Sequence, residues 1–351
     1  MRNKTIKFLT VVALATCVLS ARAQDSVATV PEGMITFNIP QDVTTYLSFP
    51  LTSNLTYTGV VSGVTSTTIT VADSPAPWNA GALATASAPY FVKFLTGSEV
   101  GRIMLVTANT ANSLTLDVTD HSLQTVYLTA SGFSVAEGDT FEIFAGDTLT
   151  SIFGNNTAQN PLLLQGSANI FTADTVSIYC PALMHWQVYF FNPSNGCWQT
   201  HSSSVNANNT IIYPYGALAI TRRSGGNTSL VMTGRVSEVS PLIKTIGNNI
   251  AIYGSTGYGA DMTLSQLQLG SNWSKGTSAM TADTVSVWNQ LLNRFDIYYQ
   301  TLDSTWRKST DSTTDQSSLV VSAGNAISIL QRANVTGEAS FFSTPMPYSL
   351  E

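Results

Sequence analysis

The chain has 351 residues, of which 15 are basic and 21 acidic, so its formal net charge is −6. Charged residues make up 10% of the chain, well below the ~25% usual for soluble domains. No basic stripe is present to neutralise phosphates, which excludes nucleic acid as the expected partner. The length suffices for two or three domains with their own hydrophobic cores.

Residues 1–23 have the pattern of a secretory signal peptide. The basic start at 1–7 precedes the apolar run 8–19 and the small-residue cleavage site Ala21-Arg22-Ala23, the three parts that export signals share. A lipoprotein signal ending at Cys17 is the alternative, which the threonine before the cysteine disfavours. We therefore expect an exported protein, in the periplasm, on the outer surface or outside the cell, with no transmembrane segment after signal removal.

Strand patterns dominate the rest of the chain. Apolar and polar residues alternate in 67–71, 113–118 and 186–190, and turn-forming Gly, Asn, Asp and Pro residues separate such runs. Helical periodicity is limited to 263–269, where a threonine precedes Leu264 and Leu267, which predicts one or two helical turns. The chain is therefore predicted to be all-β.

One stretch of the chain occurs twice. Residues 172–180 recur as 281–289, with six identities in nine positions. The match continues through pairs of the same chemical class: Trp186 with Phe295, Trp198 with Trp306, Ile211 with Leu319, and Arg223 with Arg332. A match of this length indicates a duplicated unit, and each copy has the pattern of a β-meander.

The first copy is interrupted. The opening strand of the second copy, near Tyr253, is best matched by 45–51, whereas its middle section is best matched by 148–154, about 90 residues further on. We therefore predict two tandem β-sandwich-like or meander repeats, the first of them interrupted by a small β-barrel or sandwich module. The predicted limits are a signal peptide at 1–23, a first β repeat split into 24–56 and 145–240, an inserted β module at 57–144, and a second β repeat at 241–351.

Several short segments of the chain form a pattern known from one group of proteins. They are Tyr46–Leu51, Tyr57-Thr58-Gly59, Phe94–Gly97 with Gly101-Arg102, Val106–Thr110 with Leu114–Leu116, Gly138-Asp139, Thr148-Leu149 with Phe153-Gly154, and the two Ala-Asp-Thr-Val segments. In these segments the chain resembles an uncharacterised family of exported proteins that occur as many paralogues in verrucomicrobial bacteria. The resemblance covers nearly the whole mature chain. It implies export and paralogy, and no activity, ligand or catalytic residue of that family is established that might be transferred.

The sequence offers no catalytic, cofactor-binding or metal-binding constellation. His121, His185 and His201 lack the spacing of metal ligands. Cys180 and Cys197 are expected at opposite ends of one strand, ~20 Å apart, which disfavours a disulfide without deciding the question. His185 and His201 flank the same meander, so a nucleophilic pair with Cys197 is an alternative.

Two aspartates and one tryptophan are the remaining candidates for a specific role. Asp174 and Asp283 begin equivalent strands and are expected to accept backbone hydrogen bonds in a local Asx-type turn, with calcium binding as the alternative. Trp78 lies in a Pro-rich loop of the insert and has no duplicate. Because an indole face stacks on sugars, Trp78 is the candidate ligand-binding residue, whereas the duplicated Trp198 and Trp306 are expected in the core.

Export, tandem β units and few charges favour a non-enzymatic structural or adhesive protein of the bacterial cell envelope or extracellular space. The expected partners are further copies of the chain or a surface polysaccharide, and no cofactor is expected. A carbohydrate-binding module is the alternative. A secreted hydrolase is the third candidate, because the 21 acidic residues include enough carboxylates for the pair that glycosidases need.

Overall fold

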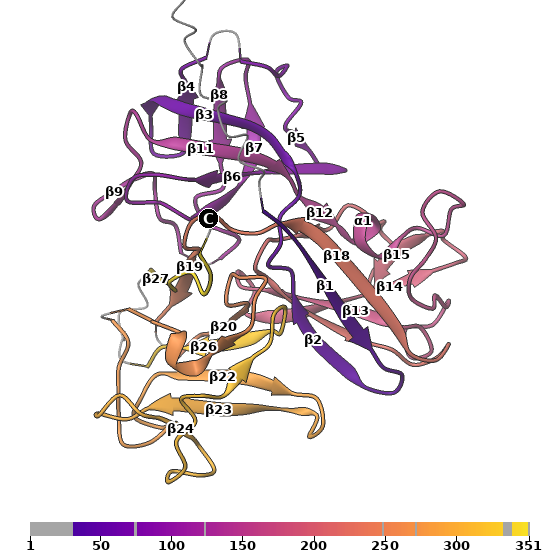
Figure 1. Ribbon diagram of the computed structural model, residues 1–351. Coiled ribbons are helices and arrows are strands. Elements are labelled where there is room, and N and C mark those ends of the chain that lie inside the picture. The colour runs from indigo at the N-terminus through magenta and orange to yellow at the C-terminus, as the bar shows by residue number, and fades with distance from the viewer. Residues whose placement is uncertain are drawn as a thin grey trace, which may run out of the picture. The chain divides into compact units, whose positions relative to one another are not determined.

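The protein is described by a computed structural model over residues 31–73, 76–122, 124–247, 249–270, 272–332 and 339–349. The signal peptide predicted at 1–23 lies outside these residues. Within them, helical structure is limited to α1 (Leu149–Phe153) and the 3₁₀ turn η1 (Leu264–Gln266), the latter inside the segment predicted to be helical. Strands make up most of the ordered elements, so the prediction of an all-β protein is confirmed (Figure 1).

Six strands close into a barrel: β3 (Leu55–Val64), β4 (Thr68–Val71), β6 (Ala88–Phe94), β7 (Ile103–Asn109), β8 (Ser113–Leu116) and β11 (Thr140–Ala145). They are paired in the order β11-β3-β4-β8-β7-β6, and β11 also pairs with β6. The ring therefore leaves no strand with a free edge. Phe94, Leu114 and Phe141 are fully buried in its interior. Of the two architectures predicted for the inserted module, the closed barrel is the one observed.

Three short strands accompany the barrel: β5 (Ala84–Thr85), β9 (Thr129–Ala130) and β10 (Phe133–Ser134). The first repeat comprises β1 (Glu32–Ile39), β2 (Thr44–Ser48), β12 (Asp147–Thr148), α1, β13 (Thr175–Cys180), β14 (His185–Asn192), β15 (Cys197–Thr200), β16 (Ile211–Ile212), β17 (Ala217–Thr221) and β18 (Thr228–Arg235). The second comprises β19 (Leu242–Ile246), β20 (Ala251–Gly254), β21 (Met262–Thr263), η1, β22 (Thr284–Asn289), β23 (Arg294–Gln300), β24 (Trp306–Lys308), β25 (Val320–Val321), β26 (Ile327–Leu330) and β27 (Ala339–Ser343).

The elements of the two repeats correspond one to one. The first has a five-stranded sheet in the order β15-β14-β13-β17-β2, and the second has one in the order β24-β23-β22-β26-β20. Each repeat adds a long ribbon, β1–β18 or β19–β27, and a short strand pair, β12–β16 or β21–β25. The barrel is connected between β2 and β12, where the second repeat has only residues 255–261. The exact domain limits stay a sequence-based prediction.

Asp174 and Asp283, which occupy equivalent positions in the two repeats, hydrogen-bond to equivalent loops. Asp174 accepts hydrogen bonds from the N–H groups of Gln165 (2.8 Å) and Arg223 (2.7 Å). Asp283 accepts them from Ser274 (2.8 Å) and Arg332 (2.6 Å). Backbone N–H groups are among the partners, as expected, but they come from other loops instead of a local turn, and Asp174 also forms a buried ion pair with Arg222 at 3.0 Å.

The strand ladders correct one detail of the sequence alignment. Ile211 pairs with Thr148, and Val320 pairs with Thr263, so Ile211 corresponds to Val320 and not to Leu319. A shift of one residue would have moved the side chain to the opposite face of the strand. The correspondence of Trp198 with Trp306 holds, and both indoles are buried.

The two five-stranded sheets contact each other through aromatic residues at equivalent positions: Tyr46, Tyr179 and Trp186 in the first repeat, and Tyr253, Trp288 and Phe295 in the second. The Tyr46 ring centroid lies 4.3 Å from that of Trp288 and 5.0 Å from that of Phe295. In return, the Tyr253 centroid lies 4.7 Å from that of Tyr179 and 5.2 Å from that of Trp186. Each tyrosine thus packs on the aromatic pair of the other repeat.

The backbone bridges between the repeats show the same reciprocity. Leu47 of β2 bridges to Asn325, and Gly254 of β20 bridges to Gly216. By the strand ladders, Leu47 corresponds to Gly254, and Gly216 corresponds to Asn325. Mutual contacts of this kind characterise a two-fold, isologous interface, so the repeats pack like the two subunits of a homodimer.

Replacing Trp198 by Ala is expected to destabilise the protein by about 3–5 kcal/mol. Its side chain is fully buried, and its indole N–H donates to the carbonyl of Gly154 at 2.8 Å. Urea denaturation monitored by circular dichroism measures the free energy of unfolding. Phe171→Ala, at a position that is 73% exposed, is the control and is expected to cost less. Trp186 is unsuitable for this purpose, because it packs in the aromatic contact between the two sheets. Equal losses in the two variants would contradict the assignment of Trp198 to the core.

Candidate functional site

A cavity of about 140 Å³ lies where the barrel and both repeats meet. Its wall is mostly apolar, and each part contributes to it: Phe91 and Ile103 from the barrel, Ile178 and Tyr213 from the first repeat, and Ile243 and Ile329 from the second. A volume of this order, ~150 Å³, holds a molecule the size of benzene. The charged residues Arg102, Asp120 and Lys244 also line the cavity.

Arg102 is the centre of the first charged cluster. Its guanidinium is almost completely buried and pairs with Glu99 and Asp120, each at 2.9 Å. It also donates to the carbonyl of Val126 at 3.1 Å, and it lies 5.2 Å from the ring centroid of Phe341, a residue of β27. One side chain of the barrel therefore contacts the barrel's own loops and the second repeat.

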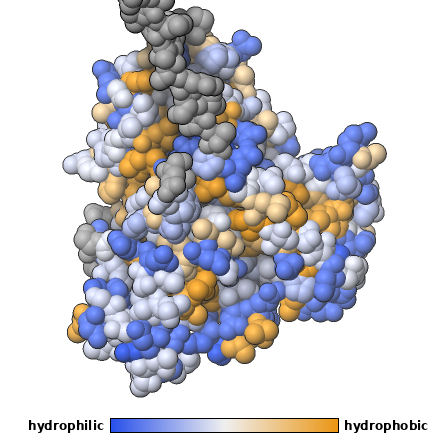
Figure 2. Space-filling view, viewed as in Figure 1, coloured by the Kyte–Doolittle hydropathy of each residue, from blue (hydrophilic) through white to orange (hydrophobic). Residues whose placement is uncertain are grey.

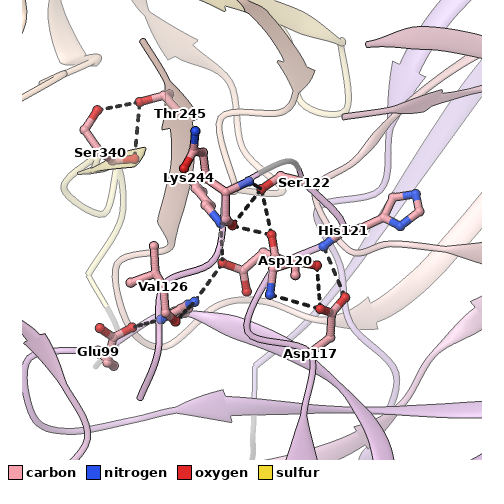
Figure 3. Close-up of polar contacts among 12 residues, drawn as sticks. Glu99, Asp117, Asp120, His121, Ser122, Val126, Lys244, Thr245 and Ser340 are labelled. Atoms are coloured by element: carbon pink, nitrogen blue, oxygen red, sulfur yellow. Dashed lines mark hydrogen bonds and ion pairs between the residues drawn. The ribbon is translucent and has the colours of Figure 1, made fainter. Parts of the chain in front are cut away.

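Lys244 extends the cluster from strand β19. Its ammonium donates to the carbonyls of Thr119, at 2.9 Å, and of Gln124, and it lies 3.6 Å from Asp120 (Figure 3). Burial lowers the pKa of Lys244 to about 8, against the raising effect of Asp120. The second repeat thus inserts a cation into a polar loop of the barrel module.

The loop that receives Lys244 is shaped by its own sequence. The Asp117 carboxylate accepts hydrogen bonds from the backbone N–H groups of Thr119 (2.9 Å) and His121 (3.2 Å), an Asx-type turn. Asp120 and His121 both have positive φ, at 49° and 55°. This strained turn directs the Asp120 carboxylate towards both Arg102 and Lys244.

A second charged cluster joins the barrel to the first repeat. Glu142 of β11 pairs with Arg235, at the end of β18, at 2.8 Å and with Lys93 of β6 at 3.5 Å. Lys93 also donates to Ser237 at 3.0 Å, and Arg235 lies 3.4 Å from Glu238. Burial lowers the pKa of Lys93 against the effect of Glu142.

The two clusters have the chemistry of structural contacts. Each pairs two cations with two carboxylates, and buried charges are tolerated when they are paired and hydrogen-bonded. The charged groups of each cluster are therefore engaged in ion pairs with one another. Across the described ranges, no group of three or more His, Cys, Asp or Glu side chains is placed to hold a metal ion.

Trp78, the predicted ligand-binding residue, packs on the barrel. Its ring meets that of Tyr57 edge-on at 4.9 Å, and its indole N–H donates to the carbonyl of Thr110 at 2.9 Å. The side chain remains half-exposed. Trp78 stays a candidate, and the structure assigns it a packing role as well.

Cys180 and Cys197, the two cysteines within the described residues, are free and buried. Cys180 pairs with His185 at one end of β14, and Cys197 pairs with Asn192 at the other, which is the meander register predicted from sequence. The Cys180 sulfur lies 3.3 Å from Nε2 of His121. The predicted alternative placed His185 and His201 near Cys197 instead. The contact of Cys180 with His121 is not visible in the sequence, because His121 belongs to the inserted module.

Comparisons with protein-family profiles, with curated proteins and with solved structures gave no match. The resemblance to the exported verrucomicrobial family therefore stays a sequence-based prediction. No helix within the described ranges is long and apolar enough to cross a bilayer.

The Arg102→Met variant is expected to lose about 3–5 kcal/mol of unfolding free energy, because it leaves Glu99 and Asp120 buried without their cation. Arg294→Met is the matched control: the Arg294 side chain is 55% exposed beside Asp296, and exposed pairs contribute about 0–1 kcal/mol. Chemical denaturation of both variants measures the difference. A loss of the same size in the control would show that Arg102 has no special role.

The lowered pKa of Lys244 predicts that the stability of the protein depends on pH. Its pKa of about 8 in the folded protein lies below the ~10.4 of an unfolded lysine. Between these values the unfolded state binds more protons, so this residue makes the unfolding free energy rise with pH. Lys244→Met should remove that contribution. Urea titrations at several pH values between about 7 and 10 test this, and equal slopes for both proteins would contradict it.

Proposed function

We propose that this chain is an exported, non-enzymatic protein with a structural or adhesive role in the bacterial cell envelope or extracellular space. The proposal is supported by the way its ionisable and aromatic residues are used. The charged clusters around Arg102 and Glu142 join the barrel to the repeats, and the aromatic residues of the two sheets pack on one another. These charged and aromatic groups therefore form contacts between the parts of the chain.

The observation that carries the proposal is a set of exposed apolar side chains that recur at equivalent positions of the two repeats. Phe171 (73% exposed) corresponds to Met280 (78%), and Leu183 (58%) corresponds to Leu292 (53%). Leu291, beside Leu292 in the same hairpin, is 97% exposed. Single exposed apolar residues are ordinary, whereas contiguous exposed apolar patches mark contact surfaces; Leu291 and Leu292 lie next to each other in one hairpin. Figure 2 shows a mostly hydrophilic face with apolar patches, one of them at the end of the β22–β23 hairpin.

Purified mature protein is expected to form assemblies through these residues. Size-exclusion chromatography with light scattering, together with negative-stain electron microscopy, should detect oligomers of the wild type. The combined Leu183→Ser and Leu292→Ser variant should shift the distribution towards monomer. Val205→Ser is the matched control, because Val205 is 73% exposed in the first repeat and lies outside the recurrent set.

Cell fractionation and electron microscopy, with and without the gene, test the role itself. A surface-attached or matrix-bound protein, and an altered surface in its absence, would support the proposal. A protein that is wholly monomeric and freely soluble, together with an unchanged cell surface, would overturn it.

Carbohydrate binding is the second candidate function, and a pocket in the first repeat favours it.

A further inference from the structure

A second pocket, of about 520 Å³ and more open to solvent than the central cavity, lies at one end of the first repeat's sheet. Its volume falls in the range of ~300–1,000 Å³ typical of small-molecule sites. Strands β13, β14 and β15 supply Cys180, Gln187, Tyr189 and Thr200, and the barrel module supplies His121. Tyr213 and His121 stack at 4.5 Å, with 15° between the ring planes, and form a wall that this pocket shares with the central cavity.

The pocket is lined by neutral groups. Among the described residues that line it, hydrogen-bonding capacity comes from amide, hydroxyl, thiol and imidazole groups, and none is Asp, Glu, Lys or Arg. Burial lowers the pKa of His121, so its ring is neutral near pH 7. Tyr189 and Tyr213 add aromatic surface beside the hydroxyls of Thr200, Ser202 and Thr210. Aromatic rings beside neutral donors and acceptors suit a ligand that is apolar on its faces and rich in hydroxyls at its edge.

The second repeat provides an internal comparison. The strand ladders place Asn289, Asp296 and Lys308 where the first repeat has Cys180, Gln187 and Thr200. In the second repeat Lys308 and Asn289 both donate to the Asp296 carboxylate, each at 2.8 Å. The positions that bound the pocket in one copy thus form a closed ionic cluster in the other. The fold of the repeat therefore does not require Cys180, Gln187 and Thr200 at these positions. We take their neutral chemistry to serve the pocket instead.

We propose that the pocket bounded by Cys180, Gln187, Tyr189, Thr200 and Tyr213 binds a neutral saccharide, either one or two free sugar units or the end of a polysaccharide chain. This inference rests on the second candidate function, for which it names the site and the ligand class. It places the binding surface on the first repeat and not at Trp78. A surface role for the protein is independent of it.

The first experiment identifies the ligand. Calorimetry with the mature protein tests glucose, galactose, mannose, xylose, cellobiose and maltose, and co-sedimentation with cellulose, xylan and mannan tests polymer ends. Galacturonate and glucosamine serve as charged comparators and are expected not to bind. Iodoacetamide labelling followed by peptide mass spectrometry provides a second measurement. Cys180 is buried but lines the pocket, so a bound sugar should slow its labelling. Cys197 is buried away from the pocket at the far end of β14, and its slow labelling should be unchanged.

The second experiment locates the site. The triple variant Cys180→Asn, Gln187→Asp, Thr200→Lys introduces the set that the second repeat already accommodates, and it should abolish binding while the protein stays folded. The matched control is the reverse exchange in the second repeat: Asn289→Cys, Asp296→Gln, Lys308→Thr. It should leave binding unchanged. Gln187→Ala alone provides a milder variant, with weaker binding expected, should the triple variant fail to fold.

The possible outcomes separate the site from the function. Loss of binding in the pocket variants, with binding retained in the control and in Trp78→Ala, supports the proposal. Binding that survives in the pocket variants but is lost in Trp78→Ala overturns the pocket and leaves carbohydrate binding in place. Failure of every saccharide to bind or to protect Cys180 overturns both.

Discussion

Each repeat buries one face of its five-stranded sheet in its own core and leaves the other face lined with aromatic rings. Because side chains alternate along a strand, Val176 and Ile178 point into the core while Tyr179 points away from it. Three large rings on the outer face would be costly to leave in water. The equivalent rings of the other repeat cover them, and the reciprocal bridges at Leu47 and Gly254 set the register of that contact. The remaining parts of the described chain are arranged around this two-fold core.

Buried charges join the barrel to this core, beside aromatic contacts such as that of Phe91 with Tyr213. An ion pair taken out of water repays its desolvation only when geometry and additional hydrogen bonds are good, and an unpaired partner is strongly destabilising. Arg102 and Lys244 share Asp120, and Glu142 bridges Arg235 and Lys93. A barrel docked differently would leave these charges without partners. Gly101 adds a steric condition, since a Cβ there would lie 1.9 Å from the carbonyl oxygen of Ser240. Charge pairing and close approach together specify one position of the module.

The two copies agree at the positions that hold the scaffold together and differ at one end of their sheets. Positions that hold the scaffold together keep their role: Asp174 and Asp283 bind equivalent loops, and Trp198 and Trp306 fill equivalent cores. At the end of the sheets the copies diverge, with a neutral pocket in one and an Asp296-centred ionic cluster in the other. The barrel contributes His121 to the pocketed copy. The module inserted into the first repeat thus borders this pocket.

The sequence by itself determined the class of the elements, the duplication and the presence of an insertion. These depend on local alternation, on turn residues and on matching segments such as 172–180 and 281–289, which are visible without knowledge of distant contacts. It also predicted the meander register that separates Cys180 from Cys197. Only the tertiary structure decided which residues meet across the repeats and the barrel. Tyr46 and Trp288, His121 and Cys180, and Asp120 and Lys244 are pairs far apart in sequence, and nothing local in either member marks its partner. The physical reason is that burial, pairing of charge and closure of a pocket are properties of surfaces brought together by folding.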